Sequence, residues 1–200
     1  MHPNRDFHSG DTARQEALLD QIGFAMILLN TPDGLRVAHT PLLSTGAGSV
    51  RFHLARSNAL TRHLDGATAM AVVNGPDSYV SPRWYTDADQ VPTWNYVALE
   101  LDGRVRKLDE DSLVDLLDAL SARHEARMAD GKPWTMDKLS AGKRRTLLAG
   151  ILGFELEIET SRATLKLSQN KPVAERERVI AGLEASGGGE IARLMRGLPG

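Results

Sequence analysis

Short apolar runs separated by turn residues dominate the first half of the chain. This pattern predicts five strands, over residues 24–29, 35–43, 50–55, 67–73 and 96–107. The last strand is the clearest, because apolar side chains such as Val97 and Leu99 alternate with polar ones. The turn signal Gly75-Pro76 is expected to end the fourth strand.

Helical spacing of apolar residues appears between and after these strands. Helices are predicted after the capping pattern at residues 12–15 and over residues 57–64, 111–128, 143–152, 175–185 and 191–195, with further strands over 154–159 and 163–167. Ser57 is expected to cap the second helix. The glycines at 187–189 give the backbone no preferred conformation, so we expect residues 187–200 to form a flexible C-terminal tail.

The strands before and after the glycine-rich stretch at residues 44–49 are expected to form a hairpin. If the hairpin is symmetrical about Gly46, His39 lies opposite His53, because paired positions in an antiparallel ladder have a constant sum. Two histidines alone make a poor metal site, and neither a carboxylate nor a third histidine stands in a supporting position. We therefore predict no metal site.

The number and spacing of these elements predict a mainly β fold with α-helices. Such a pattern is typical of an α+β protein built on a mixed barrel, and not of a doubly wound parallel sheet. A chain of 200 residues can bury one sizeable core. We predict a single domain over residues 1–186, with a helical insertion at about 109–152.

The amino-acid composition excludes several kinds of functional site. The chain has no cysteine, which excludes disulfides, thiolate nucleophiles and iron–sulfur clusters and favours a reducing compartment. Its formal net charge of -2 provides no overall positive field for nucleic acid or an anionic membrane. Neither a secretory signal nor an apolar run of membrane-spanning length is visible, so we predict a cytoplasmic protein without a membrane partner.

Several segments combine polar, aromatic and basic side chains beside predicted strands, which packing alone does not explain. They are H-T-P-L-L at residues 39–43, H-L-A-R-S-N at 53–58, Y-V-S-P-R-W-Y at 79–85, V-P-T-W-N-Y at 91–96 and K-L-S-Q-N at 166–170. In combination, these segments resemble the signature stretches of the PaiB-like FMN-binding family. They follow the order of that family over most of the chain.

The resemblance implies a split β-barrel with peripheral helices, of the pyridoxamine-phosphate-oxidase type, in which a homodimer binds two FMN molecules between its subunits. It also implies a role as a negative transcriptional regulator. Direct contact with DNA has weak support, because the chain is slightly acidic and lacks helix-turn-helix or zinc-finger spacing. The alternatives are an FMN-dependent oxidoreductase with NADH or NADPH as donor and, less favoured, a haem-binding split barrel. No catalytic acid or base is assigned.

The chemistry of FMN selects candidate residues within these segments. Its phosphate needs cationic or N–H donors, for which the candidates are His53, Arg56, Ser57 and Asn58. Its flat ring needs an aromatic wall with hydrogen-bond partners at the polar edge, for which the candidates are Trp84, Tyr85, Trp94 and Asn95. His39 and Thr40 are expected to reach the same pocket. Lys166 and Gln169 are expected to close the site or to stabilise the dimer.

Overall fold

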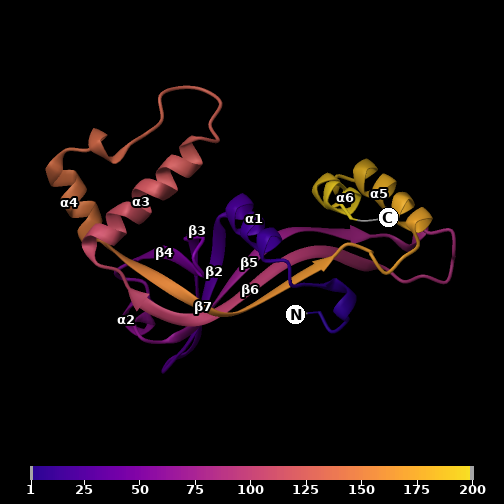
Figure 1. Cartoon of the computed structure of the whole chain (residues 1–200), viewed down its shortest axis with the longest axis horizontal. Coiled ribbons are helices and arrows are strands. Elements are labelled where there is room, and N and C mark those ends of the chain that lie inside the picture. Colours follow the sequence, from indigo (N-terminus) through magenta and orange to yellow (C-terminus); the bar gives the residue numbers. More distant parts are fainter. Residues whose placement is uncertain (1, 199–200) are drawn as a thin grey trace. The chain divides into compact units, whose positions relative to one another are not determined.

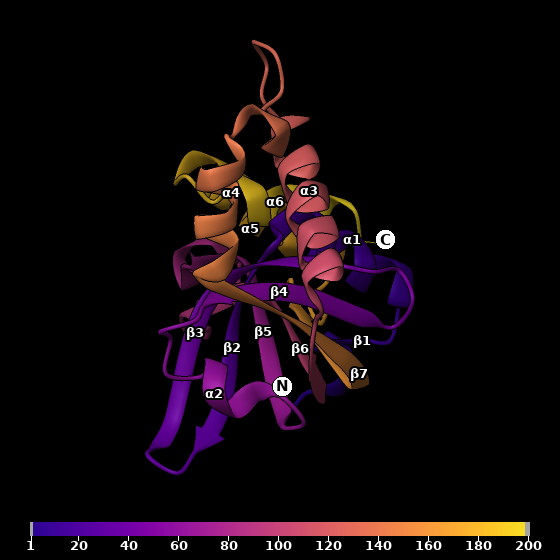
Figure 2. The ribbon, with the colours of Figure 1, turned by 90° about the vertical axis from the view of Figure 1, so that its left-hand side faces the viewer.

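The core of the fold is a sheet that closes on itself. The computed structural model describes residues 2–198. Its strands are β1 (His8–Ser9), β2 (Phe24–Thr31), β3 (Gly34–Ser44), β4 (Ser49–Ala55), β5 (Thr68–Val80), β6 (Thr93–Lys107) and β7 (Ile151–Lys166). They are hydrogen-bonded in the order β1-β7-β4-β3-β2-β5-β6, and a further pairing of β6 with β7 closes the barrel (Figure 2). The predicted α+β class and barrel are confirmed.

Helices occupy the segments between and after these strands (Figure 1). They are α1 (Thr12–Ile22), α2 (Thr61–Leu64), α3 (Glu110–Glu125), α4 (Ala141–Ala149), α5 (Val173–Ala185) and α6 (Gly189–Arg196), with short 3-10 helices η1 (Arg5–Phe7), η2 (Pro82–Trp84) and η3 (Met136–Lys138). No helix among residues 2–198 is long and apolar enough to cross a membrane.

The described chain forms two compact units. Unit 1 contains residues 2–12, 74–100 and 162–198, and unit 2 contains residues 13–73 and 101–161. Strands β5, β6 and β7 are long enough to contribute residues to both units. The prediction of a single domain over residues 1–186 stays a prediction.

Unit 2 contains the closed barrel. Alternate residues of its strands point inward, as Ile27 of β2 and Phe52 of β4 do, and both of these side chains are fully buried. Phe52 lies directly opposite Phe154 of β7, and the two rings stack with their centroids 5.6 Å apart. The apolar alternation that predicted the strands therefore fills the barrel.

Helix α3 is fixed within unit 2 at two places. Along the middle of the helix, Leu116 and Leu120 pack with Leu108 and Leu43 in one apolar cluster. Near its end, Arg123 donates a hydrogen bond of 2.9 Å to the carbonyl of Leu19 at the C-terminus of α1, which also accepts from the amide of Gly23. Helix α4 buries no residue, although it lies beside α3 in Figures 1 and 2.

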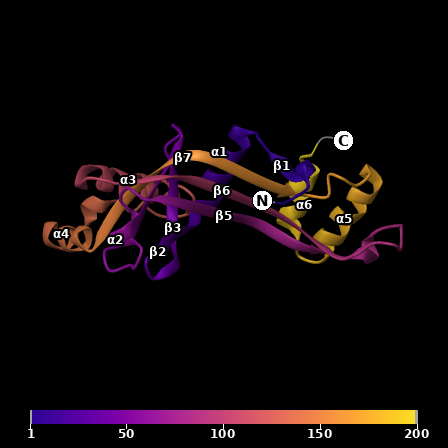
Figure 3. The same ribbon diagram turned by 90° about the horizontal axis from the view of Figure 1, so that it is seen from below.

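Unit 1 contains a pair of adjacent helices, α5 and α6, beside the last part of β5 and the first part of β6 (Figure 3). A side chain at Gly182 of α5 would lie 2.3 Å from the ring of Trp84, so only glycine allows this approach. The predicted flexible tail includes α6, which buries Ile191 and Met195, while residues 199–200 lie outside the described residues. The mobility of this tail stays a prediction.

The predicted register of the β3–β4 hairpin is wrong. Leu42 lies opposite Phe52, so paired residue numbers sum to 94, whereas pairing His39 with His53 requires a sum of 92. The turn is centred one residue later than Gly46, because the amide of Thr45 donates to the carbonyl of Ser49 over 3.0 Å. Gly46 and Gly48, on either side of the turn centre, adopt positive φ, which allows the backbone to make this turn.

Other element boundaries also differ from the predictions. The helix predicted over residues 57–64 shortens to α2, whose N-cap position is Leu60 and not Ser57. The side chain of Asn58 accepts from the amide of Leu60 in the turn before the helix. The strand expected to end at Gly75-Pro76 continues to Val80, and the two last predicted strands are one strand, β7. Gly75 allows a close approach here, since a side chain at this position would lie 2.9 Å from Val97. The helix predicted over residues 143–152 is α4, which ends at Ala149, and β7 begins two residues later at Ile151.

Candidate functional site

The twelve predicted site residues divide equally between the two units. Unit 2 contains the six from the first two motifs, which are His39, Thr40, His53, Arg56, Ser57 and Asn58. Unit 1 contains the other six, which are Trp84, Tyr85, Trp94, Asn95, Lys166 and Gln169. The phosphate candidates therefore belong to one unit and the aromatic candidates to the other.

Thr40 and His53 meet in unit 2 although the register differs from the predicted one. The hydroxyl of Thr40 donates to the carbonyl of His53 over 2.7 Å, and Thr40 is almost completely buried. The Nδ1 atom of His53 is buried without a hydrogen-bond partner among the described residues. An unpaired buried ring nitrogen is costly unless a ligand or water completes it, so His53 offers an open hydrogen-bonding position.

Burial also lowers the pKa of His53, so we expect the folded protein to resist protonation of this ring. Above the reference pKa of about 6.5 the imidazole is neutral in both states. As the pH falls from there through the lower folded-state pKa, the unfolded chain binds more protons and stability is lost. His53→Gln should therefore flatten the decline in unfolding free energy between about pH 7 and pH 5, measured by urea titration. If the unfolding free energy of the variant declined with pH as steeply as that of the wild-type protein, groups other than His53 would cause the decline.

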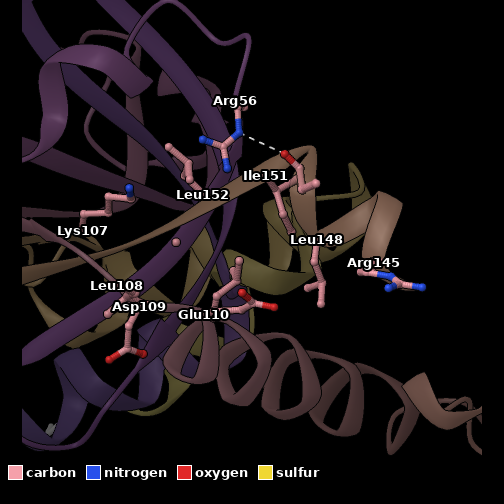
Figure 4. Close-up of a pocket in the computed structure, with 12 residues that line it drawn as sticks. Arg56, Lys107, Leu108, Asp109, Glu110, Arg145, Leu148, Ile151 and Leu152 are labelled. Atoms are coloured by element: carbon pink, nitrogen blue, oxygen red, sulfur yellow. Dashed lines mark hydrogen bonds between the residues drawn. The ribbon is translucent and has the colours of Figure 1, made fainter. Parts of the chain in front are cut away.

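Arg56 lies just after β4, at the edge of a cavity of about 420 Å³ within unit 2. Its amide donates to the carbonyl of Gly150 and its Nε to the carbonyl of Ala149, at 2.8 and 3.0 Å. Figure 4 shows Arg56 and Lys107 beside this cavity, with Glu110 across from them. The side chain is thus tethered at Nε, while its two terminal nitrogens have no described partner.

Two other arginines of the barrel, Arg51 and Arg106, are already engaged by a carboxylate. Glu155 is buried and accepts from Ser49 over 2.7 Å, from Arg51 over 2.7 Å and from Arg106 over 2.8 Å. Burial alone would raise the pKa of Glu155, but these donors lower it, so the carboxylate stays charged and holds both arginines. Three cations line the cavity, namely Arg56, Lys107 and Arg145, and none of them has an ion pair within residues 2–198, so they are available to an anionic ligand.

The two residues that follow Arg56 differ in exposure. Ser57 is exposed, whereas Asn58 is half-buried and its side-chain oxygen is used by the amide of Leu60. The helix that follows has four residues only, so the predicted phosphate site at a helix N-terminus is reduced to a turn. Of the three, Arg56 and Ser57 keep free donors. Their contact with a phosphate stays a prediction.

His39 lies on the outer face of the barrel, within an apolar surface of unit 2. It is exposed and pairs with Met26, and Val37 beside it pairs with Leu28. We call this surface the β2–β3 patch, and it consists of Phe24, Met26, Leu28, Leu35 and Val37. Phe24, Leu35 and Val37 are 50%, 61% and 45% exposed, which is unusual for apolar side chains along one hairpin.

The aromatic candidates of unit 1 are unequally accessible. Trp94 is 54% exposed and stands edge-on to Tyr79, with ring centroids 6.1 Å apart. Trp84 is half-buried against α5, and Arg178 donates to its carbonyl over 2.8 Å. Tyr79 was not among the predicted site residues, although it begins the same motif. Trp94 and Tyr79 form the exposed aromatic surface available to a flat ring.

Two motifs interlock inside unit 1. Asn95 is fully buried, and its amide donates to the hydroxyl of Ser168 over 2.9 Å. Ser168 adopts a φ of 59°, and the side chain of Gln169 holds this bend by bonding to the amide of Leu167 and the carbonyl of Leu165. Asn95 and Gln169 thus use their side chains within the unit, and their contact with a cofactor stays a prediction.

Tyr85 and Lys166 line a second cavity, of about 320 Å³, entirely within unit 1. Tyr85 is buried, and this burial raises the pKa of its phenol although a hydrogen bond with Ser168 opposes the shift. Lys171, the residue directly after Asn170 of the last motif, lines the same cavity. Its position next to that motif is the signal that could have identified it.

Comparison with known proteins places this architecture in a family. Residues 1–160 match the family described as "Putative FMN-binding domain". The protein called Protease synthase and sporulation protein PAI 2 of Bacillus subtilis is 33% identical over 133 residues, which cover 66% of this chain and 63% of that relative. The match thus spans less than two thirds of the relative's length.

Solved structures support the same fold. The FAD and heme binding protein of Mycobacterium smegmatis aligns with a TM-score of 0.62 at 21% identity, over 88% of this chain and 80% of that one. The flavocytochrome Anf3 of Azotobacter vinelandii aligns with a TM-score of 0.58 at 18% identity, over 82% and 72%. The split-barrel fold is confirmed, and FMN is the cofactor that the family match assigns. The chain belongs to the PaiB-like FMN-binding family.

Proposed function

We propose that this protein holds FMN between two copies of itself. The β2–β3 patch carries the proposal, because its exposed apolar side chains surround His39, one of the predicted cofactor residues. An apolar surface of this kind is typical of a protein interface. If a second copy of the chain covered this patch, the candidate site of one copy would lie against the surface of the other copy.

The described residues fit FMN chemically. Arg56 and Ser57 would hold the phosphate, and the unpaired Nδ1 of His53 offers a hydrogen-bonding position. Trp94 and Tyr79 provide an exposed aromatic surface for a flat ring. Bound FMN supplies one- and two-electron redox chemistry, while these residues bind and orient it.

The test is one purification followed by two measurements. We expect protein purified without added cofactor, or mixed with FMN, to show the flavin absorption spectrum and to sediment as a dimer. A haem spectrum would instead support the haem-binding alternative. A colourless protein that does not take up FMN, or a flavin-loaded monomer, would refute the proposal.

Arg56→Ala is expected to weaken FMN retention. The variant loses a charge-assisted partner of the phosphate, which corresponds to roughly 1.5–3 kcal/mol, or about 10- to 150-fold in dissociation constant. Fluorescence titration with FMN measures this change. Arg36→Ala is the matched control, because Arg36 is exposed on β3 and its side chain bonds, within residues 2–198, only to the carbonyl of its neighbour Leu35. Equal FMN affinity in both variants would show that the phosphate lies elsewhere.

For the biological role we propose regulation of transcription. The PAI 2 relative is named for protease synthesis and sporulation, which supports a regulatory role, and a cytoplasmic location would suit it. Direct DNA binding is expected to be weak because the net charge is -2. A gel shift with the dimer at low salt tests it, and the absence of any shift would leave regulation through another partner.

An FMN-dependent oxidoreductase is the second candidate. One observation favours it, namely the cavity of unit 1 with two lysines, since NADH and NADPH carry phosphates. Rapid mixing of the flavin-loaded protein with each nucleotide should then bleach the flavin. Persistent flavin absorbance with both would exclude this donor class.

A further inference from the structure

The cavity of unit 1 contains an unbalanced positive charge. Its lining includes Lys166 and Lys171, and no aspartate or glutamate. Lys166 donates to the hydroxyl of Thr93, and Lys171 donates to the side-chain oxygen of Gln90 over 2.8 Å. Neither lysine has a carboxylate partner among the described residues. The two ammonium groups are therefore partly buried with neutral oxygens as their hydrogen-bond partners, although the exposed Asp87, outside the lining, attracts Lys171 electrostatically.

Aromatic rings hold these ammonium groups in place. The Nζ atom of Lys166 lies 5.9 Å from the ring centre of Phe7, and that of Lys171 lies 5.1 Å from the ring centre of Tyr85. Burial lowers the pKa of Lys166, as expected for a cation without a counter-charge. An anion in the cavity would offset this cost of burial.

Side-chain hydrogen bonds fix the backbone conformation between the two lysines. Ser168 has the only positive φ of a non-glycine residue in the described chain, and it is fixed by Asn95 and by its neighbour Gln169. A backbone conformation of this kind costs free energy and is found preferentially at ligand sites. The bend places Lys166 on one side of Ser168 and Lys171 on the other, both lining one cavity.

The donor set favours phosphate over carboxylate. Lysine offers a compact charge with three donors, and two lysines in one cavity can share the charge of a phosphate, which is a dianion near neutral pH, whereas a carboxylate carries one negative charge. No arginine lines this cavity, while Asn170 and Tyr85 add neutral polar groups. Its volume of about 320 Å³ suits a phosphate with a small organic group attached.

We propose that the cavity between Lys166 and Lys171 binds a phosphate group of a second ligand, distinct from FMN. The phosphate of FMN is assigned above to Arg56, which is not part of this cavity. The proposal stands without the flavin assignment, because every residue that carries it belongs to unit 1.

The test uses the full-length protein as purified, with its flavin content recorded, and inorganic pyrophosphate as the probe in calorimetric titration. We expect one pyrophosphate per chain. Lys166→Gln and Lys171→Gln should each weaken binding about tenfold or more, since each removes a charge-assisted hydrogen bond. Lys171→Arg should retain part of the affinity. Lys132→Gln removes an exposed lysine of unit 2 and should change nothing.

Two other outcomes would overturn the proposal, and a third separates it from the flavin site. If the wild-type protein does not bind pyrophosphate, or if both lysine variants bind it equally well, the cavity is not a phosphate site. If the lysine variants lose FMN together with pyrophosphate, the cavity belongs to the flavin. A protein that binds pyrophosphate but never takes up FMN would support this proposal and refute the flavin site.

Discussion

Val37→Asp is expected to give a monomer that does not retain FMN. Val37 is 45% exposed near the middle of the β2–β3 patch and pairs with Leu28 across the hairpin. A carboxylate buried there in a dimer, without a partner, would cost at least about 3 kcal/mol, which raises the dimer dissociation constant by about 100-fold or more. Sedimentation velocity and flavin absorbance of the same sample measure both effects.

The chain offers a matched control for this experiment. Val173 is 50% exposed and is the first residue of α5, where an acidic side chain is favourable. Val173→Asp should therefore leave both the dimer and the flavin unchanged. Thermal unfolding should show that Val37→Asp folds, because the substituted side chain already faces solvent in one chain. A Val37→Asp protein that stays dimeric and yellow would remove the patch from the interface.

Strand positions could be predicted wherever the signal was local. The alternation that begins near Val97 is a property of neighbouring residues, and β6 follows it with its even-numbered side chains outward. The same reasoning failed in the middle of β7, where exposed polar residues look like a loop. There Arg162 pairs with Glu100 of β6 over 3.0 Å, and the neighbouring strand keeps the segment extended. The residue that makes this contact is far away in the sequence, so a local pattern cannot reveal it.

The hairpin shows why register is harder to predict than strand position. Moving the turn centre by one residue, from Gly46 to the next position, shifts every cross-strand pair by two. Both glycines of this stretch permit positive φ, so the sequence alone was compatible with either turn. Thr40 and His53 still meet, because a hydroxyl-to-carbonyl bond joins them.

The motifs identified the family, but they did not show which side chains share a site. Asn95 and Trp94 are adjacent in one motif, yet Asn95 is buried in a structural network while Trp94 is exposed. Opposite faces of a strand have different surroundings, and which face is covered depends on tertiary packing. Lys171 was missed because it lies just beyond the motif that its cavity shares.

Gly103→Ala is expected to destabilise the barrel by about 3 kcal/mol. Gly103 lies in β6 where it meets β7 and closes the sheet, and a side chain there would lie 1.8 Å from the carbonyl oxygen of Glu157. Because the obstacle is backbone, rotation of a flexible side chain cannot relieve it, and overpacking of this kind falls at the upper end of its usual cost.

The same substitution at Gly142 is the control that isolates this clash. Gly142 lies within α4 with no atom near its missing side chain, and alanine in an exposed helix is favoured over glycine by about 0.5–1 kcal/mol. Urea unfolding should therefore move in opposite directions for Gly103→Ala and Gly142→Ala. If Gly103→Ala were as stable as the wild-type protein, β6 and β7 would not approach this closely, and barrel closure would need another explanation.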